Sequence, residues 1–192
     1  MTDWIIEVDQ QMFLWVQEHL RVPSLDLWMS LIRDKHFWLP LYVFIIAYLA
    51  FQNRKEWLGI TLACMLLVGV SDQFSSNFLK KKVNRKRPCK EIILKERFTP
   101  VAGCSGGKSF PSSHATNHAA LGMFFYIFFR RKWGWPAGLF ILWPILIGFA
   151  QIYIGVHYPT DILAGLFLGA SLGWLCYFAY LKISVKVHPL AR

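Results

Sequence analysis

Acidic side chains are scarce in this sequence. Its 192 residues include 11 Asp and Glu against 21 Lys and Arg, so the formal net charge is +10. An excess of positive charge can indicate nucleic-acid binding. Here, however, the basic residues stand mainly in short connections between apolar blocks, and the chain has no nucleic-acid-binding motif, low-complexity tract or internal repeat. We therefore expect these cations to face anionic lipid headgroups and phosphate, with no nucleic acid as a partner.

Cysteine is also scarce, and its spacing excludes the usual metal centres. The four cysteines show no metal-ligand pattern. We expect neither a metal nor a cofactor in this protein. Cys64 and Cys176 lie inside apolar blocks, where we expect them to pack. Cys89 and Cys104 share a polar loop. They either form a disulfide, if that loop faces an oxidising compartment, or remain two free thiols.

Apolar residues, by contrast, are abundant and occur in long blocks. The chain is 55% hydrophobic and 17% aromatic, and long apolar blocks without a helical stripe are typical of membrane spans. Tryptophans near the block ends fit side chains that anchor at the membrane interface. We predict an all-α, polytopic membrane helix bundle of about five transmembrane helices, over residues 37–51, 57–79, 112–129, 133–153 and 159–181.

Residues 1–192 are expected to form one membrane-embedded domain, with interfacial helices over 1–35, the bundle over 36–182 and a basic tail. Acidic residues near the N-terminus argue against a cleavable signal peptide. We predict instead an amphipathic helix lying in the membrane interface and a second short helix over 25–32. The apolar residues on one side of the first helix are Trp4, Ile5, Val8, Met12 and Trp15.

Three polar clusters stand at the edges of the apolar blocks. The first is basic and begins at Lys80, the second ends at His114, and the third contains His157 and Asp161. With five spans, all three clusters lie on the same side of the membrane. They share that side with the connection over 80–111, which we expect to be an active-site loop because long loops in compact domains are usually functional.

The second cluster, Pro-Ser-Ser-His, is a good start for a helix. A proline followed by serines favours a helix N-terminus, where hydroxyls cap free N–H groups. Such an end attracts anions, phosphate above all. We expect the Ser112 side chain and the main-chain N–H groups of Ser113 and His114 to hold phosphate oxygens.

The patterns Lys-x6-Arg-Pro, Pro-Ser-x-His and His-x3-Asp follow one another between Lys80 and Asp161. In this the chain resembles the type 2 phosphatidic-acid phosphatase superfamily. The resemblance implies a metal-independent enzyme that dephosphorylates a lipid phosphate or diphosphate through a phosphohistidine. The family includes enzymes for undecaprenyl diphosphate, phosphatidylglycerol phosphate and lipid A phosphates. The partners implied are a lipid phosphate substrate and membrane lipids, with no protein partner.

The resemblance also implies a role for each matching residue. The nucleophile is the histidine of the third pattern, here His157, and Asp161 would hold one of its ring nitrogens. His114 would protonate the leaving group as general acid. Lys80 and Arg87 would bind the phosphate, Arg87 through two oxygens at once. The other cations of the basic cluster are expected to form a solvated or lipid-facing surface: Lys81, Lys82, Arg85 and Lys86.

One position departs from the family. The third pattern normally begins with Ser-Arg, and here Ala150 and Gln151 stand in those places. Gln151 would give a phosphate oxygen one neutral hydrogen bond, which is weaker than a charged fork. We expect Lys108 to supply the missing cation, with Arg97 as the other possibility. The alternative is a catalytically weakened protein that binds or transports lipid phosphates.

A metal-dependent hydrolase built on His114, His118, His157 and Asp161 is a further alternative, but the Glu of a His-Glu-x-x-His zinc site is missing. We expect His118 to be a buried polar residue bonded within the bundle. Asp72 is costly inside a membrane, and we expect it to tether the basic loop.

The side of the membrane is predicted from two opposing signals. More Lys and Arg fall on the motif side, which by the positive-inside rule would be cytoplasmic. Much of that excess lies in one loop where phosphate binding already requires cations, and resemblance to bacterial family members implies the opposite. We therefore expect a multi-pass protein of the cell membrane with its active site facing the extracytoplasmic side.

Overall fold

The computed structural model describes residues 3–54, 56–104 and 106–187. Within these ranges the chain is helical and contains no strand, which confirms the all-α class. The expected basic tail over 182–192 is helical as far as Val187. Residues 188–192 lie outside the described part of the chain, as does Lys55 in the turn after the first expected span.

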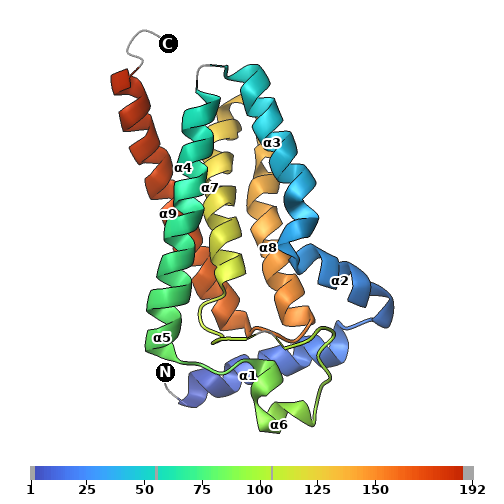
Figure 1. The fold of residues 1–192 in the computed structure, drawn as a ribbon. Helices are drawn as coiled ribbons and strands as arrows, with labels where there is room; N and C mark the ends of the chain where they lie inside the picture. The colour runs from blue at the N-terminus through green and yellow to red at the C-terminus, as the bar shows by residue number, and fades with distance from the viewer. Residues whose placement is uncertain (1–2, 55, 105, 188–192) are drawn as a thin grey trace.

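Long helices running side by side form the body of the molecule (Figure 1). Trp57–Val83 is one continuous helix, in which a π-helical turn over Gln73–Leu79 separates α4 from α5. A 3-10 turn over Trp135–Gly138 leads into α8. The bounds lie within a few residues of the predicted spans: α3 Leu39–Gln52, α4 Trp57–Asp72, α5 Lys80–Val83, α7 Ser113–Trp133, α8 Leu139–Tyr153 and α9 Pro159–Val187.

Three of these helical segments are long and apolar enough to cross a membrane: Trp57–Val83, Trp135–Tyr153 and Pro159–Ser184. Helix α3 has only 14 residues, and α7 is less apolar because its first turns carry polar residues that face a cavity. The count of five spans therefore stays a prediction. Large apolar side chains such as Phe44, Leu66 and Phe167 are more than half exposed on the outside of the bundle, as they would be in contact with lipid.

Helix α7 is the central element of the bundle, since it packs against α4, α8 and α9. Its contact with α9 depends on glycines spaced four residues apart. A Cβ atom at Gly169 or Gly173 would collide with a main-chain oxygen of α7, and one at Gly165 with the carbonyl oxygen of Ser112, which caps α7. These small residues thus allow α7 and α9 to pack closely.

The N-terminal segment lies across the lower end of the bundle (Figure 1). Helix α1 (Asp3–His19) buries Asp9, Phe13 and Gln17 against the bundle and leaves Trp4 and Trp15 exposed. A 3-10 turn, Pro23–Leu25, precedes α2 (Asp26–Arg33), and another, Lys35–Trp38, precedes α3. The expected apolar side of α1 thus faces outward, while its other side is docked on protein. That the outer side meets a membrane interface stays a prediction.

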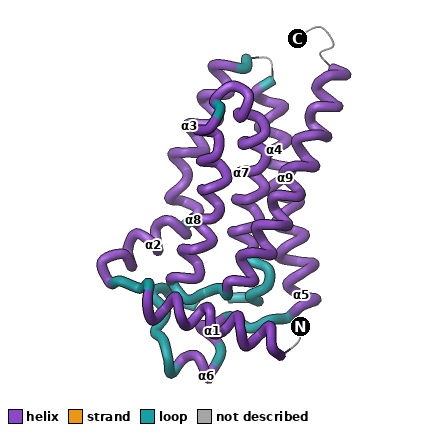
Figure 2. Tube along the Cα trace, turned by 180° about the vertical axis from the view of Figure 1, so that it is seen from behind, coloured by secondary structure: helices purple, strands orange, loops and turns teal. Residues whose placement is uncertain are grey.

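The connections that carry the polar clusters gather at the same end as α1 (Figure 2). The long connection after α5 contains a 3-10 turn over Pro88–Lys90 and the short α6 (Ile92–Lys95). The turn between α8 and α9 lies beside it, and the main-chain N–H of Val101 donates to the carbonyl of Ile154. The three predicted clusters therefore meet at one end of the bundle.

We expect Gly169→Ala to destabilise the protein by about 1–3 kcal/mol, because the added methyl group collides with the Thr116 carbonyl oxygen on α7. Gly138→Ala is the matched control, since a Cβ there meets no atom within 4 Å and alanine favours helix. Thermal unfolding in detergent micelles measures both. Equal melting temperatures for the two variants would contradict the close α7–α9 contact.

Candidate active site

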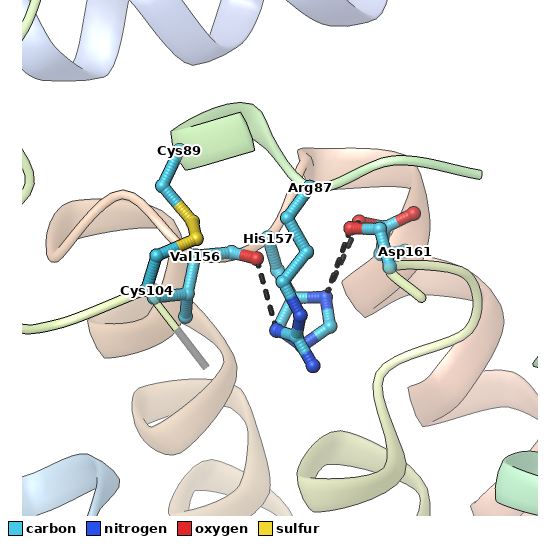
Figure 3. The surroundings of a disulfide bond; sticks show 7 residues. Arg87, Cys89, Cys104, Val156, His157 and Asp161 are labelled. Atoms are coloured by element: carbon cyan, nitrogen blue, oxygen red, sulfur yellow. Dashed lines mark hydrogen bonds and ion pairs between the residues drawn. A yellow bond between two sulfur atoms is a disulfide. The ribbon is translucent and has the colours of Figure 1, made fainter. Parts of the chain in front are cut away.

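His157 lies in the turn between α8 and α9, and its side chain is almost fully buried. Its Nδ1 is 3.2 Å from Oδ2 of Asp161, and its Nε2 is 2.9 Å from Nη1 of Arg87. Because a guanidinium only donates and a carboxylate accepts, the proton sits on Nδ1 and the lone pair on Nε2. Pro159 begins α9 and places Asp161 in its first turn. In Figure 3 a dashed line joins the ring to Asp161, and the Arg87 side chain passes across the ring in this view.

The Asp161 carboxylate is completely buried and fully hydrogen-bonded. Oδ2 also accepts from the Ser109 hydroxyl at 2.5 Å and from the Tyr158 main-chain N–H at 2.9 Å. Oδ1 accepts from Nη1 of Arg85 at 3.0 Å. A buried carboxylate with this set of donors is held rigidly as an anion, so it can orient the His157 ring and stabilise positive charge on it.

Arg85 was assigned to the solvated surface on sequence grounds, and that assignment is wrong. Its side chain is nearly buried and bridges two buried carboxylates, Asp161 and Asp9 of α1, the latter at 2.6 Å. The guanidinium also lies 3.9 Å from the centre of the Tyr158 ring. Asp9 further accepts from the main-chain N–H of Thr160 at 2.9 Å. Arg85 and Asp9 are 76 positions apart, and no pattern in the sequence connects them.

Arg87 is buried beside the Nε2 atom of His157. Its Nη1 also donates to the Val156 carbonyl at 3.1 Å. Within the described residues, its buried Nε–H has no partner. An unpaired buried donor is unfavourable. Because this donor belongs to a cation, an anion bound in its place beside His157 would satisfy both its hydrogen bond and its charge.

The disulfide question is decided by the structure, in which Cys89 and Cys104 are bonded, with their Cα atoms 5.8 Å apart. Cys89 follows Arg87 by two residues, so the bridge fixes the segment that carries this arginine (Figure 3). Cys64 and Cys176 remain free thiols.

The residues of all three patterns line one cavity of about 600 Å³. Ser113 at the start of α7 is held there by a hydrogen bond of 2.8 Å between its hydroxyl and that of Ser76. The sequence-predicted site residues in the lining are Lys80, Arg87, Ser113, His114, Gln151 and His157.

Burial lowers the pKa of His157 to about 4, against the raising effect of its hydrogen bond to Asp161, and the positive charge of Arg87 lowers it too. The imidazole is therefore neutral at pH 7. Its Nε2 therefore keeps a lone pair, which is what a nucleophilic imidazole requires.

Ser112 and Gln151 form hydrogen bonds with each other and with the protein main chain. The Ser112 hydroxyl accepts from the Ala115 N–H, as a helix cap does, and donates to Oε1 of Gln151 at 2.9 Å. The Gln151 amide donates to the Ile147 carbonyl at 3.3 Å. The pair ties the start of α7 to α8, which leaves one Gln151 N–H for a ligand.

The two cations expected to replace the missing arginine lie elsewhere. Arg97 forms an exposed ion pair with Glu18 at 2.8 Å, and Lys108 is not among the residues that line the cavity. The cavity is lined instead by Arg33 and Lys35, next to α3. Sequence reasoning missed them because they lie outside the three patterns, in the segment assigned to the membrane interface.

The remaining polar side chains are bonded within the bundle. His118 accepts from the Tyr42 hydroxyl at 2.9 Å and donates to the His114 carbonyl at 2.8 Å, as expected. Asp72 accepts from Ser76 and from Asn117, so it joins α4 to α7. Its negative charge also acts on Lys80, the first residue of the basic cluster. In the described part of the chain, no three His, Cys, Asp or Glu side chains form a group that could hold a metal ion.

A buried histidine–aspartate pair beside a cation-lined cavity, at the end of an apolar helix bundle, suits a membrane protein that handles phosphate esters. Residues 57–184 match the PAP2 superfamily. The chain therefore belongs to the PAP2 superfamily, which confirms the resemblance.

Particular relatives extend this likeness over nearly the whole chain. The chain is 32% identical to a lipid A 4'-phosphatase of Bacteroides thetaiotaomicron, over 98% of this chain and 84% of that protein. It is 34% identical to a lipid A 4'-phosphatase of Porphyromonas gingivalis, over 98% and 83%.

Two solved structures share the fold. The transmembrane PAP2-type phosphatidylglycerolphosphate phosphatase from Bacillus subtilis superposes with a TM-score of 0.70 at 26% identity, covering 97% of this chain and 89% of that chain. LpxE of Aquifex aeolicus gives 0.63 at 23% identity, over 91% and 95%.

We expect Arg85→Met to lower the stability by about 3–5 kcal/mol, because it leaves Asp9 and Asp161 buried without their shared cation. Lys86→Met, at the exposed next position, should change it by about 0.5 kcal/mol or less. Thermal unfolding in detergent measures the difference. Similar melting temperatures for both variants would show that the bridge contributes little.

Proposed function

We propose that this protein is a metal-independent phosphatase of a membrane lipid phosphate and works through a phosphohistidine on Nε2 of His157. The observation that carries the proposal is the state of the ring: Nδ1–H is bound to Asp161, and the Nε2 lone pair is held by a cation next to a cavity. A histidine so oriented is prepared to act as a nucleophile.

In the first step, Nε2 attacks phosphorus and the bond to the ester oxygen breaks, while His114, which the bound phosphate dianion holds in its protonated form, gives its proton to that oxygen. Asp161 stabilises the positive charge on the phosphorylated ring. In the second step, water attacks phosphorus after passing a proton to His114, the P–N bond breaks, and inorganic phosphate leaves with the His157 ring neutral again. Lys80 and Arg87 bind the phosphate oxygens throughout, with the N–H groups at the start of α7.

An apolar groove beside the cavity supports a lipid as the substrate. It has a volume of about 340 Å³ and lies between α3, α4 and α7, where Ile45, Leu49 and Met65 are among its lining residues. Its lower end shares Asn117 and His118 with the catalytic cavity. An acyl chain in this groove would hold the phosphate of the same lipid at the cavity.

The relatives named above support one substrate class over the others. Both that match over 98% of this chain are lipid A 4'-phosphatases. We therefore propose a phosphorylated glycolipid of the lipid A type, dephosphorylated at the 4' position, ahead of undecaprenyl diphosphate or phosphatidylglycerol phosphate. The alternative of a weakened binding or transport protein has no support in these relatives.

The disulfide supports an extracytoplasmic position for the cavity. Bonded cysteines persist in oxidising compartments, and Cys89 and Cys104 lie at the end of the bundle that carries the cavity. We propose five transmembrane helices, with this end on the extracytoplasmic side of the cell membrane.

We expect purified protein to release inorganic phosphate from lipid A and to leave a product without the 4' phosphate. His157→Ala should lower the rate by about 10³-fold or more, because the nucleophile is lost. A strong chelator should leave the rate unchanged. Phosphate release and mass spectrometry of the lipid product measure these effects, and His19→Ala, at an exposed histidine of α1, is the control.

Other outcomes would favour other functions. Activity that survives His157→Ala would reject the phosphohistidine. Activity lost in chelator and restored by a divalent cation would favour the metal-dependent hydrolase. Binding without release across lipid A, undecaprenyl diphosphate and phosphatidylglycerol phosphate would favour a binding protein.

The orientation has its own test. We expect Lys82→Cys, at the exposed end of α5, to react with a membrane-impermeant maleimide on intact cells, and Arg131→Cys, in the last turn of α7, to react only after lysis. The expectation follows because the two positions lie at opposite ends of the bundle (Figure 1). The reverse labelling pattern would place the cavity in the cytoplasm.

A further inference from the structure

The cavity lacks one cation that its family normally supplies. Gln151 stands in the place of an arginine, and its amide is engaged by Ser112 and the Ile147 carbonyl. A phosphate dianion in a poorly solvated site needs opposing charge. Some other cation must then take part, if the proposed function is right.

Arg33 is placed to do so. It is the last residue of α2, a helix that packs against α8, where Gln151 lies. Its half-buried side chain lines the catalytic cavity together with His114 and His157. Arg33 therefore approaches the cavity from a helix next to the one that carries the family's arginine.

The Arg33 guanidinium is free to bind an anion. Across the described ranges, it forms no hydrogen bond or ion pair with the protein. The adjacent carboxylate, Asp34, accepts instead from the main-chain N–H and the ring of His36, each at 2.9 Å. Burial also lowers the pKa of Arg33, partly opposed by Asp34, as expected for a cation that is withdrawn from water without a full partner.

Arg33 shares the cavity lining with Arg87, one of the two cations proposed above to bind phosphate, and its charge acts on that residue. Burial lowers the pKa of Arg87, Asp161 raises it, and the positive charge of Arg33 lowers it again. Two guanidinium groups that repel each other across one cavity are both stabilised when a dianion enters between them.

We infer that Arg33 binds the phosphate group of the substrate and takes the place of the missing arginine of the third pattern. The Arg33 guanidinium reaches the cavity from α2, and its planar group can donate hydrogen bonds to two phosphate oxygens at once. The inference rests on the proposed function and adds a substrate-binding residue to it.

A charge exchange between the two positions tests this inference. We expect Arg33→Gln to lower kcat/KM for lipid A by about 10²-fold, the scale for loss of one charged donor, and to raise the inhibition constant of inorganic phosphate. Arg33→Lys should retain more activity. In the double variant Arg33→Gln with Gln151→Arg, the arginine returns to its family position and activity should recover at least tenfold over Arg33→Gln. Arg130→Gln, at the exposed far end of α7, is the control.

Three outcomes would overturn the inference. In the first, Arg33→Gln leaves kcat/KM and phosphate inhibition at wild-type values. In the second, Arg33→Gln and Arg33→Lys both lower the melting temperature, and the loss of activity follows that loss of stability. In the third, Arg33→Gln lowers kcat/KM by the same factor in the wild-type protein and in the Gln151→Arg variant, which would show that the two positions act independently. A failure of the proposed function would be seen in the wild-type protein itself. That protein would then release no phosphate from any lipid, and inorganic phosphate would not raise its melting temperature.

Discussion

The buried carboxylate of Asp161 is the constraint on which the site depends. It accepts hydrogen bonds from His157, Ser109, Tyr158 and Arg85, which come from the turn before α9 and from both ends of the long connection. A buried anion tolerates no missing donor, because each unpaired oxygen would cost several kcal/mol. The connection and the turn must therefore fold together around it, and α1 closes the arrangement by adding Asp9 to the other side of Arg85.

The helix bundle positions this polar network at the edge of an apolar body. Close contact between α7 and α9, permitted by three glycines, brings the start of α7 beside the start of α9. This contact brings His114 and Asp161, each in the first turn of its helix, to the same end of the bundle. The apolar groove between α3, α4 and α7 ends at the same cavity, so charge and lipid chain can be bound by one continuous surface.

Gln151 stands where the family has an arginine, and under the inference drawn above Arg33 returns a positive charge to the cavity from another helix. Gln151 serves as a neutral link between α8 and the cap of α7, a role in which a long cation would disturb the Ser112 bond. Positive charge is available from the N-terminal segment instead. That segment therefore reaches the cavity, through Arg33 in its lining and through Asp9, which shares Arg85 with Asp161.

The sequence by itself determined the helical class, the limits of the long helices within a few residues, and the three patterns that meet in the cavity, because apolar blocks, caps and motif spacing are local signals. It left the pairing of Cys89 with Cys104 open, and it gave no sign that Arg85 is buried, that Lys108 lies outside the cavity lining or that Arg33 lies within it. Those facts depend on which segments dock on one another across dozens of positions. Only the tertiary structure decides them, since a lone charged residue has the same local sequence signal whether it meets solvent, a carboxylate or a phosphate site.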